Sequence, residues 1–216
     1  MNKAIIGKKL GMTQVFLADG TMVPVTVIQA GPCTVTQKKT VARDGYEALQ
    51  LGFETVAERK LTKPQLGHLK KSGVVVKHLH EFKLDNCDLD VGATIECDIF
   101  AEGDYVDITG ITKGHGFTGV IKRWNQHRLK ETHGVGPVHR EVGSMGPISS
   151  PSRVMPGKNL PGHYGVEQVT ILNLSVVKVD KELGVILVKG AVPGAKNSIV
   201  YVRNAVKKSG KRSKPQ

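Results

Sequence analysis

The chain has 216 residues, 39% of them hydrophobic, with 25 glycines, 10 prolines and a formal net charge of +12. This is globular composition shifted toward turns, and no apolar run approaches the ~20 residues that span a bilayer or is placed to act as a signal peptide, so a soluble cytoplasmic protein is expected. Cys33, Cys87 and Cys97 form no CxxC pair, which argues against a disulfide framework or zinc ribbon and favours reduced, structural cysteines.

The first third of the chain predicts β-strands. Thr13–Leu17 and Met22–Ile28 flank an Ala-Asp-Gly turn, which is a strong hairpin signal. Pro24 favours an edge position or a bulge, because proline has no N–H to donate to a ladder. Further strands are expected at Thr34–Lys38 and Ala48–Phe53.

A short helical insertion is predicted over 57–73, where Thr62 can cap a helix and Pro64 suits its first turn. Strands then return, with alternation at Tyr105–Thr112, a second hairpin over 169–194 and a last strand in 198–206. The fold class expected is mainly β. Its globular body is discontinuous and consists of 1–112 and 164–206.

Between these β segments lies a stretch, 113–163, with few strand or helix signals. Its 51 residues include eight Lys and Arg, two acids, five of the eight histidines and five of the ten prolines. One helix is predicted, at Thr118–Lys130, with Ile121, Trp124 and Leu129 on one side. A plain flexible loop is the alternative, but interspersed apolar residues favour a segment that becomes ordered against a partner.

Charge is distributed unevenly along the chain. From Glu81 to Asp107 there are nine acids and one base, whereas after Glu182 there are eight bases and no acid, ending in a basic tail at 207–216. This pattern predicts that the basic regions form a surface that binds a polyanion and that the acidic stretch lies on a surface turned away from it. An anionic membrane is the competing partner, but no amphipathic helix accompanies the basic clusters, so nucleic acid is favoured.

Enzyme-like patterns in the chain are weak. GHGFTG at 114–119 is a G-x-G-x-x-G sequence, but no second strand with an acid follows it, so a nicotinamide site is rejected. His78 and His80 share a predicted strand face without a third metal ligand. Ser144 has no Asp within 113–163 to complete a triad. Three further histidines lie six residues apart, a spacing that brings no ligands together: His127, His133 and His139. No catalytic residue, metal, cofactor or small-molecule substrate is expected.

The cations of 113–163 recur along the segment, with Trp124 among them. Bases spaced on an extended chain can contact successive phosphates, and Arg or His planes can stack on unpaired bases, whereas a solvated basic face is the plain alternative. RNA is favoured over DNA because no helix-turn-helix, zinc finger or basic zipper is found.

Five segments, in order and covering nearly the whole chain, carry a family resemblance: IIGKKLGMTQVF, TKPQLGHLKKSG, VDITGITKGHGFTGVIKRWN, the THG…HR…GSMG…LPGHYG series and VILVKGAVPG. Together they resemble the L-three family of bacterial large-subunit ribosomal proteins. The resemblance implies a translation-factor-type β-barrel body on 23S rRNA, contacts with neighbouring ribosomal proteins and a role in early subunit assembly. It also implies an extension, 113–163, that penetrates rRNA and approaches the peptidyl transferase centre, with no catalytic residues.

The residues expected to contact rRNA are Lys8, Lys9, Lys70, Lys71, Lys113, Lys122, Arg123, Trp124, Arg128, His139, Arg140, Arg153, Lys158 and His163. The tip expected near the peptidyl transferase centre is Gly143, Ser144, Met145, Gly146, Pro147, Ile148, Ser149 and Ser150. Some relatives carry a methylated glutamine where this chain has Pro147. Proline has no side-chain amide, so that modification is not expected here.

Overall fold

The computed structural model describes residues 3–84 and 89–207 and divides the chain into two units. The first unit contains Met1–Thr112 and Gln168–Gln216, and the second is the inserted segment Lys113–Glu167. Cys87 and residues 208–216 of the predicted tail lie outside the described residues. Among the described residues, no helix combines the length and apolarity needed to cross a membrane.

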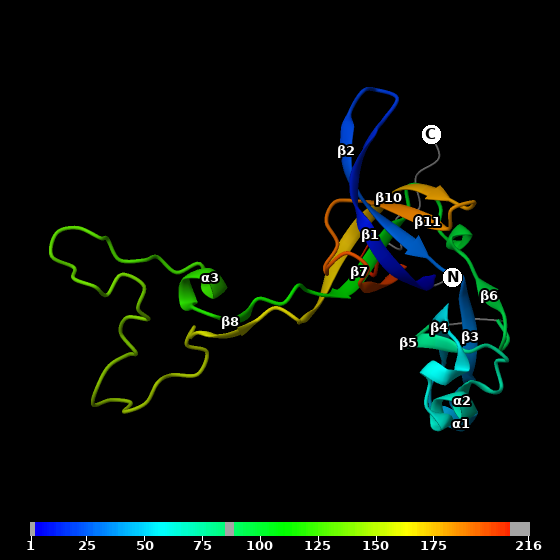
Figure 1. Cartoon of the computed structure of the whole chain (residues 1–216), viewed down its shortest axis with the longest axis horizontal. Helices are drawn as coiled ribbons and strands as arrows, with labels where there is room; N and C mark the ends of the chain where they lie inside the picture. The colour runs from blue at the N-terminus through cyan, green and yellow to red at the C-terminus, as the bar shows by residue number, and fades with distance from the viewer. Residues whose placement is uncertain (1–2, 85–88, 208–216) are drawn as a thin grey trace. The chain divides into compact units, whose positions relative to one another are not determined.

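The first unit is built on a closed six-stranded barrel, in the order β1-β12-β7-β10-β11-β2 (Figure 1). Its strands are β1 (Ala4–Phe16), β2 (Met22–Ala30), β7 (Tyr105–Ile111), β10 (Gln168–Asp180), β11 (Val185–Lys189) and β12 (Ile199–Asn204). Every neighbouring pair is antiparallel. Both predicted hairpins, β1–β2 and β10–β11, are present, and the mainly β fold with a barrel body is confirmed.

Pro24 takes an edge position, one of the two alternatives predicted from the sequence. β2 as a whole is an inner strand of the barrel, because it pairs with β1 on one side and with β11 on the other. Pro24 itself pairs with Gln14 of β1, whereas the ladder with β11 ends at Val25. The missing N–H of Pro24 therefore falls just beyond the three-stranded part of the sheet, where no ladder bond is lost.

Residues after β2 form a second sheet instead of further barrel strands. Its order is β5-β4-β3-β6, comprising β3 (Cys33–Lys39), β4 (Ala48–Thr55), β5 (Val76–Phe82) and β6 (Thr94–Ile95). Short helices accompany it: α1 (Val41–Asp44), η1 (Glu58–Lys60), α2 (Lys63–Leu69) and η2 (Cys97–Ile99). The predicted Thr62 cap is present, since Thr62 and Gln65 form a capping box at the start of α2.

The barrel and the four-stranded sheet share one hydrophobic core. Ile5, Ile108 and Val200 of the barrel belong to the same buried cluster as Leu51 and Phe53 of β4. Burial of apolar area at this scale is the main source of stability, because each fully buried aliphatic side chain contributes ~1.5–3 kcal/mol. The second sheet is therefore part of one folded body and stabilises the barrel.

Two cysteines of this body are free and buried, as expected for structural residues. Cys33 at the start of β3 is fully buried, and burial raises the pKa of its thiol to about 12. Its Sγ lies 3.3 Å from the carbonyl oxygen of Ile6. Because the thiolate is the reactive form, Cys33 is inert near neutral pH.

A buried carboxylate joins three segments of the barrel. Asp107 of β7 has no solvent exposure, and its oxygens accept hydrogen bonds from the backbone N–H groups of Asn173 (2.9 Å) and Val206 (3.1 Å). Asn173 has a positive φ of 58° and lies at a shift in the register between β10 and β7. Asp107 thus satisfies an amide that the bulge removes from the ladder.

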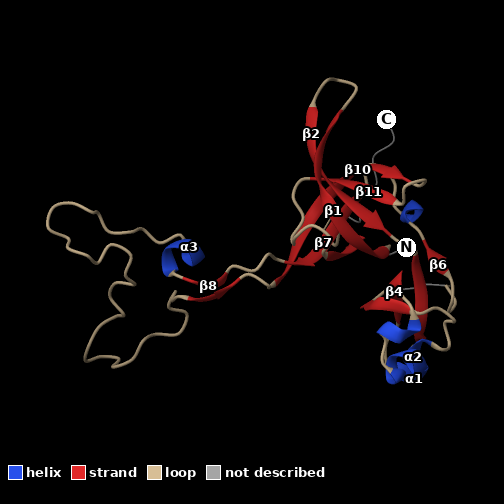
Figure 2. Ribbon diagram, viewed as in Figure 1, coloured by secondary structure: helices blue, strands red, loops and turns tan. Residues whose placement is uncertain are grey.

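The second unit contains little regular structure (Figure 2). β8 (Gly116–Thr118) and β9 (Gly162–Tyr164) form a two-stranded antiparallel sheet, followed after β8 by one helical turn, α3 (Val120–Trp124). The helix predicted at Thr118–Lys130 is therefore wrong in extent. Thr118 belongs to β8, and Asn125, at φ 55°, ends the helix in the left-handed conformation. Without a core to cover Leu129, which is 52% exposed, further turns have nothing to stabilise them.

The second unit also ends at Glu167, four residues beyond the expected boundary at 163. Tyr164 pairs with Gly116, and its carbonyl oxygen accepts a hydrogen bond from His115 N–H at 2.8 Å. β9, on the return to the first unit, is thus hydrogen-bonded to β8 and to His115 before the chain enters β10. β8 and β9 each contain only three residues. That is too few for the alternation of apolar and polar residues by which a strand is predicted from sequence.

Candidate nucleic-acid interface

The base of the second unit is a closely packed pair of strands. The rings of His115 and Tyr164 stack with centroids 4.9 Å apart and planes at 21°. Gly165 has a positive φ of 81°, and a Cβ there would lie 2.1 Å from the carbonyl oxygen of Lys113. No other residue fits this position, because any side chain would force the two strands apart. The base is therefore a defined structure from which the longer loop begins.

Above the base, α3 binds the returning chain at Leu160. Both the Arg123 guanidinium and the Trp124 indole N–H donate to the carbonyl oxygen of Leu160, each at 3.0 Å. The guanidinium carbon also lies 5.0 Å from the centroid of the Trp124 ring. Gly162 leaves room for this arrangement, since a Cβ there would lie 2.6 Å from Arg123 Nη1. Arg123 and Trp124 consequently have a structural function in addition to any contact with RNA.

Beyond this point the loop is held by a few polar contacts. Leu129 N–H donates to the carbonyl oxygen of His139 at 3.1 Å, and the His139 ring lies 3.0 Å from the carbonyl oxygen of Lys130. Further on, Lys158 Nζ donates to the carbonyl oxygen of Ser144 at 3.0 Å. These bonds are exposed and individually weak, so they bias the path of the loop without making a core.

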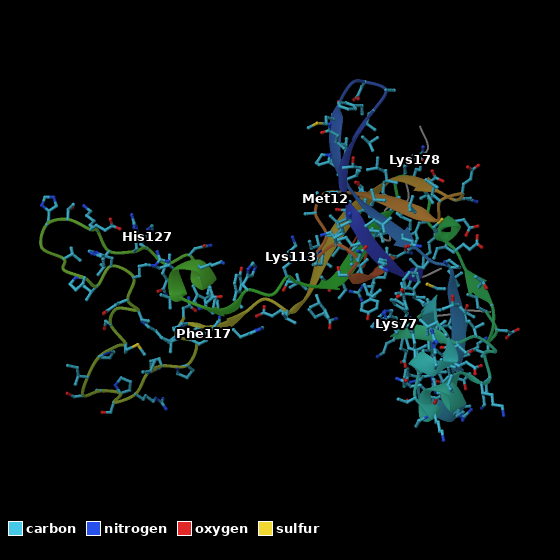
Figure 3. All side chains as sticks on the ribbon, viewed as in Figure 1. Met12, Lys77, Lys113, Phe117, His127 and Lys178 are labelled. Atoms are coloured by element: carbon cyan, nitrogen blue, oxygen red, sulfur yellow. The ribbon has the colours of Figure 1, made fainter. Side chains whose placement is uncertain are left out.

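The second unit exposes most of its apolar side chains. In Lys113–Glu167, all of which the structure describes, the buried side chains are Thr118 and Val120. Phe117 is 81% exposed and Ile148 is 91% exposed. Figure 3 shows the labelled Phe117 and His127 on this loop-rich segment, with side chains pointing outward along its length. A segment that buries so little apolar surface has little within itself to offset the entropy of ordering it.

The second unit carries an excess of positive charge. Lys113–Glu167 contains eight Lys and Arg against three Glu. Arg123 is half-buried and Arg128 pairs with Glu131, and the rest of the eight have exposed side chains: Lys113, Lys122, Lys130, Arg140, Arg153 and Lys158. Spaced cations on an extended backbone match successive phosphates of a nucleic acid.

Phe117 and His163 add exposed rings at the base. They are paired across the β8–β9 ladder and both are exposed, so they present a flat, partly apolar face on which an unpaired base can stack. His163 was predicted from the sequence as an rRNA contact, whereas Phe117 was not. The signal that could have identified Phe117 is an aromatic residue among the glycines of GHGFTG, where no core position is available.

The predicted tip residues Gly143–Ser150 are all exposed. Ser144 is the residue of this group whose carbonyl oxygen is bound by Lys158. Pro147 lies among them and is exposed like the rest. The tip therefore offers backbone and small side chains, with Met145 and Ile148 as its apolar groups.

Predicted contact residues in the first unit differ in how available their charges are. Lys70 and Lys71, at the end of α2, are exposed. Lys8 lies 3.8 Å from Glu54, and Lys9 Nζ donates to the carbonyl oxygens of Val192 (2.7 Å) and Gly194 (2.9 Å). The contacts of Lys9 assign it to holding the 192–194 loop against β1, so we leave it out of the candidate interface.

A groove in the first unit was not anticipated from the sequence. It encloses about 500 Å³ between β5 and the barrel and is lined by Lys83, Arg203 and the stacked rings of His80 and Tyr201, whose centroids are 3.7 Å apart. Burial lowers the pKa of His80, although Glu81 opposes the shift, so the ring is neutral at pH 7. Cations beside a neutral aromatic stack suit a nucleotide. These residues come from distant strands, so no sequence motif marks them.

The structure also bears on the enzyme-like patterns. β8, inside GHGFTG, pairs antiparallel with β9, so this segment does not form the βαβ unit of a dinucleotide site. Within residues 3–84 and 89–207, no group of three or more His, Cys, Asp or Glu side chains is placed to hold a metal ion. His78 lies 3.4 Å from Glu54, a pairing of two groups without a third.

A closed barrel carrying a basic insertion that lacks its own core defines a structural, RNA-binding class of protein. The family model described as Ribosomal protein L3 matches residues 54–184, which is more than half of the chain. The chain belongs to the ribosomal protein L3 family. It is accordingly a structural component of the large ribosomal subunit that binds rRNA and functions in translation.

Proposed function

We propose that the second unit, Lys113–Glu167, is the main rRNA contact and acquires its final order on the RNA. The observation that supports this most strongly is the combination of exposed apolar side chains with eight cations in a unit that buries only two side chains. Phosphate neutralisation supplies affinity, the glycines permit close approach, and the prolines reduce the entropy lost on binding. Lys83 and Arg203 in the groove supply a second contact from the first unit.

The proposal extends to assembly and to the catalytic centre of the ribosome. The resemblance described above supports early binding to 23S rRNA in the cytoplasmic large subunit and an approach of Gly143–Ser150 to the peptidyl transferase centre. The exposure of all eight tip residues is compatible with insertion between RNA elements. In this proposal the side chains support the RNA and perform no chemistry.

Sucrose-gradient fractionation of a lysate tests the proposal as a whole. We expect the chain to sediment with large subunits and with their precursors, and to remain there at high salt. Depletion of the chain should lower the yield of mature large subunits. Recovery in ribosome-free fractions alone would contradict the proposal.

Trp124 provides a direct measure of RNA binding. It is the single tryptophan of the chain and is 44% exposed. We expect its fluorescence emission to shift to shorter wavelength, with quenching, when a large-subunit rRNA fragment is added, because RNA covers the ring and excludes water. Trp124→Phe should abolish the signal. An unchanged spectrum at saturating RNA would show that α3 lies outside the contact.

Substitutions in the tip should alter drug sensitivity without affecting the fold. We expect Met145→Ala and Ile148→Ala to change growth inhibition by drugs of the peptidyl transferase centre, through displaced RNA. Stability of the free protein should stay within ~0.5 kcal/mol, since both side chains are exposed. Chemical footprinting of the rRNA with and without drug provides the measurement. Identical footprints and growth would argue against a tip near the centre.

A further inference from the structure

The hairpin of β1 and β2 continues beyond the barrel (Figure 1). Pairing of β1 with β12 ends at Lys8, and pairing of β2 with β11 ends at Val25. The register of β1 with β2 continues to the pair Phe16–Met22. We call this two-stranded part, Met12–Pro24, the arm.

One face of the arm is apolar and exposed. Phe16 and Met22 are directly opposite in the register, Gln14 is opposite Pro24, and Met12 shares their face because side chains alternate along a strand. Phe16 is 65% exposed, Met22 54% and Met12 53%. Figure 3 labels Met12 on β1. Val23, on the other face, is buried, whereas Leu17, next to the turn, is 43% exposed and adds to the apolar surface of the arm.

The arm lacks the charge that the second unit has in abundance. No Lys or Arg occurs between Lys9 and Lys38, in a chain with 31 such residues. Asp19 is the single charged residue of the arm, and its carboxylate accepts the N–H of Thr21 at 2.9 Å within the turn. RNA binding depends on phosphate neutralisation, which the arm cannot provide.

The chemistry of this face instead fits a protein. Contiguous exposed apolar side chains on a charged protein mark interaction sites, and Phe and Met are enriched in the buried centres of protein interfaces. Methionine adapts its shape to an irregular partner. In addition, the outer edge of β1 past Lys9 pairs with no strand among the described residues, which leaves a ladder edge to which a partner strand can add.

From these observations we infer that the arm docks an apolar surface of a neighbouring protein in the large subunit, by its Met12–Phe16–Met22 face. Membership of the family places the chain in a particle that contains other proteins. The inference concerns a different surface from the rRNA contacts proposed above and a different class of partner.

Site-specific photocrosslinking in purified large subunits tests the inference. p-Benzoylphenylalanine replaces Phe16 in one variant and Phe117 in a matched control, since both are exposed phenylalanines. After irradiation and RNase digestion, we expect the Phe16 position to yield an RNase-resistant adduct, identified by mass spectrometry as another large-subunit protein. Met12→Ser with Met22→Ser should reduce that adduct at least fivefold, without changing the melting temperature of the free protein.

The outcomes separate this inference from the rRNA proposal. An adduct of position 16 with rRNA, with a second copy of the chain, or with nothing would overturn the inference. The Phe117 control should give an adduct that disappears on RNase digestion. Failure of that control with a protein adduct at position 16 would count against the proposed RNA contact and leave the arm's partner established.

Discussion

Removing residues 126–159 is expected to lower rRNA affinity by at least about a hundredfold at ~0.1 M salt and to flatten its salt dependence. The deleted segment contains five cations: Arg128, Lys130, Arg140, Arg153 and Lys158. Each cation that neutralises a phosphate contributes ~0.7–0.9 to the slope of log affinity against log salt, so losing all five should lower the slope by about 3.5 to 4.5. Arg128 contributes least, because Glu131 competes for it.

The structure indicates how this deletion can be made without disturbing the base. Arg123 and Trp124 both hydrogen-bond the carbonyl oxygen of Leu160, so the chain on either side of the gap is already close. A short Gly-Ser linker from Asn125 to Leu160 should therefore preserve β8, α3 and β9. Circular dichroism and the melting temperature of the free protein should be nearly unchanged, because 126–159 buries no side chain.

A full-length variant provides the matched control. Replacing the same five cations by Gln keeps the loop and removes its charge, and it should reproduce the change in slope with a smaller loss of affinity. Adding Arg203→Ala to the deletion should weaken the residual binding if the groove contributes. Filter binding over a salt series measures all four proteins. A deletion variant with the slope of the intact chain would show that its electrostatic contacts lie elsewhere.

Replacement of Asp107 is expected to have the largest effect on stability. Asp107→Ala removes the carboxylate oxygens that accept from the Asn173 and Val206 N–H groups, in two hydrogen bonds that are both partly buried. The loss of each bond to a side-chain carboxyl group costs ~1–2 kcal/mol, so the free energy of unfolding should fall by about 2–4 kcal/mol. The loss should be greatest where β7 meets β10, the two strands from which the second unit leaves and to which it returns.

Urea denaturation of the purified chain provides the measurement, with two comparisons. Asp98→Ala removes an exposed carboxylate 3.7 Å from Lys181 and should change stability by less than ~0.5 kcal/mol. Asp107→Asn keeps one acceptor but turns an N–H toward a backbone N–H, and it should also destabilise. An Asp107→Ala variant as stable as Asp98→Ala would show that the bulge of β10 is held by its other contacts.

Several elements of the barrel were predictable because local chemistry and the final fold agree. Ala-Asp-Gly at 18–20 and Lys-Glu-Leu-Gly at 181–184 each separate two β-rich stretches, and both become hairpin turns in the structure. Thr62 and Pro64 likewise mark the start of α2. In contrast, the predicted helix at Thr118–Lys130 rested on three apolar residues, and those residues have no core to pack against. Periodicity stabilises a helix only where another element covers its apolar side.

The sequence by itself determined the class of this protein: a mainly β body, a basic insertion poor in acids, and the motifs of a ribosomal family. Composition and local turn signals are sufficient to predict these three features, because each feature depends only on residue types and on their spacing over short stretches of sequence. Only the tertiary structure decided that the strands after β2 leave the barrel, that Arg123 and Trp124 bind Leu160, and that Asp107 holds a bulge. Each of these features depends on contacts between residues that are more than 30 positions apart in the sequence. A local sequence pattern carries no information about contacts at such separations.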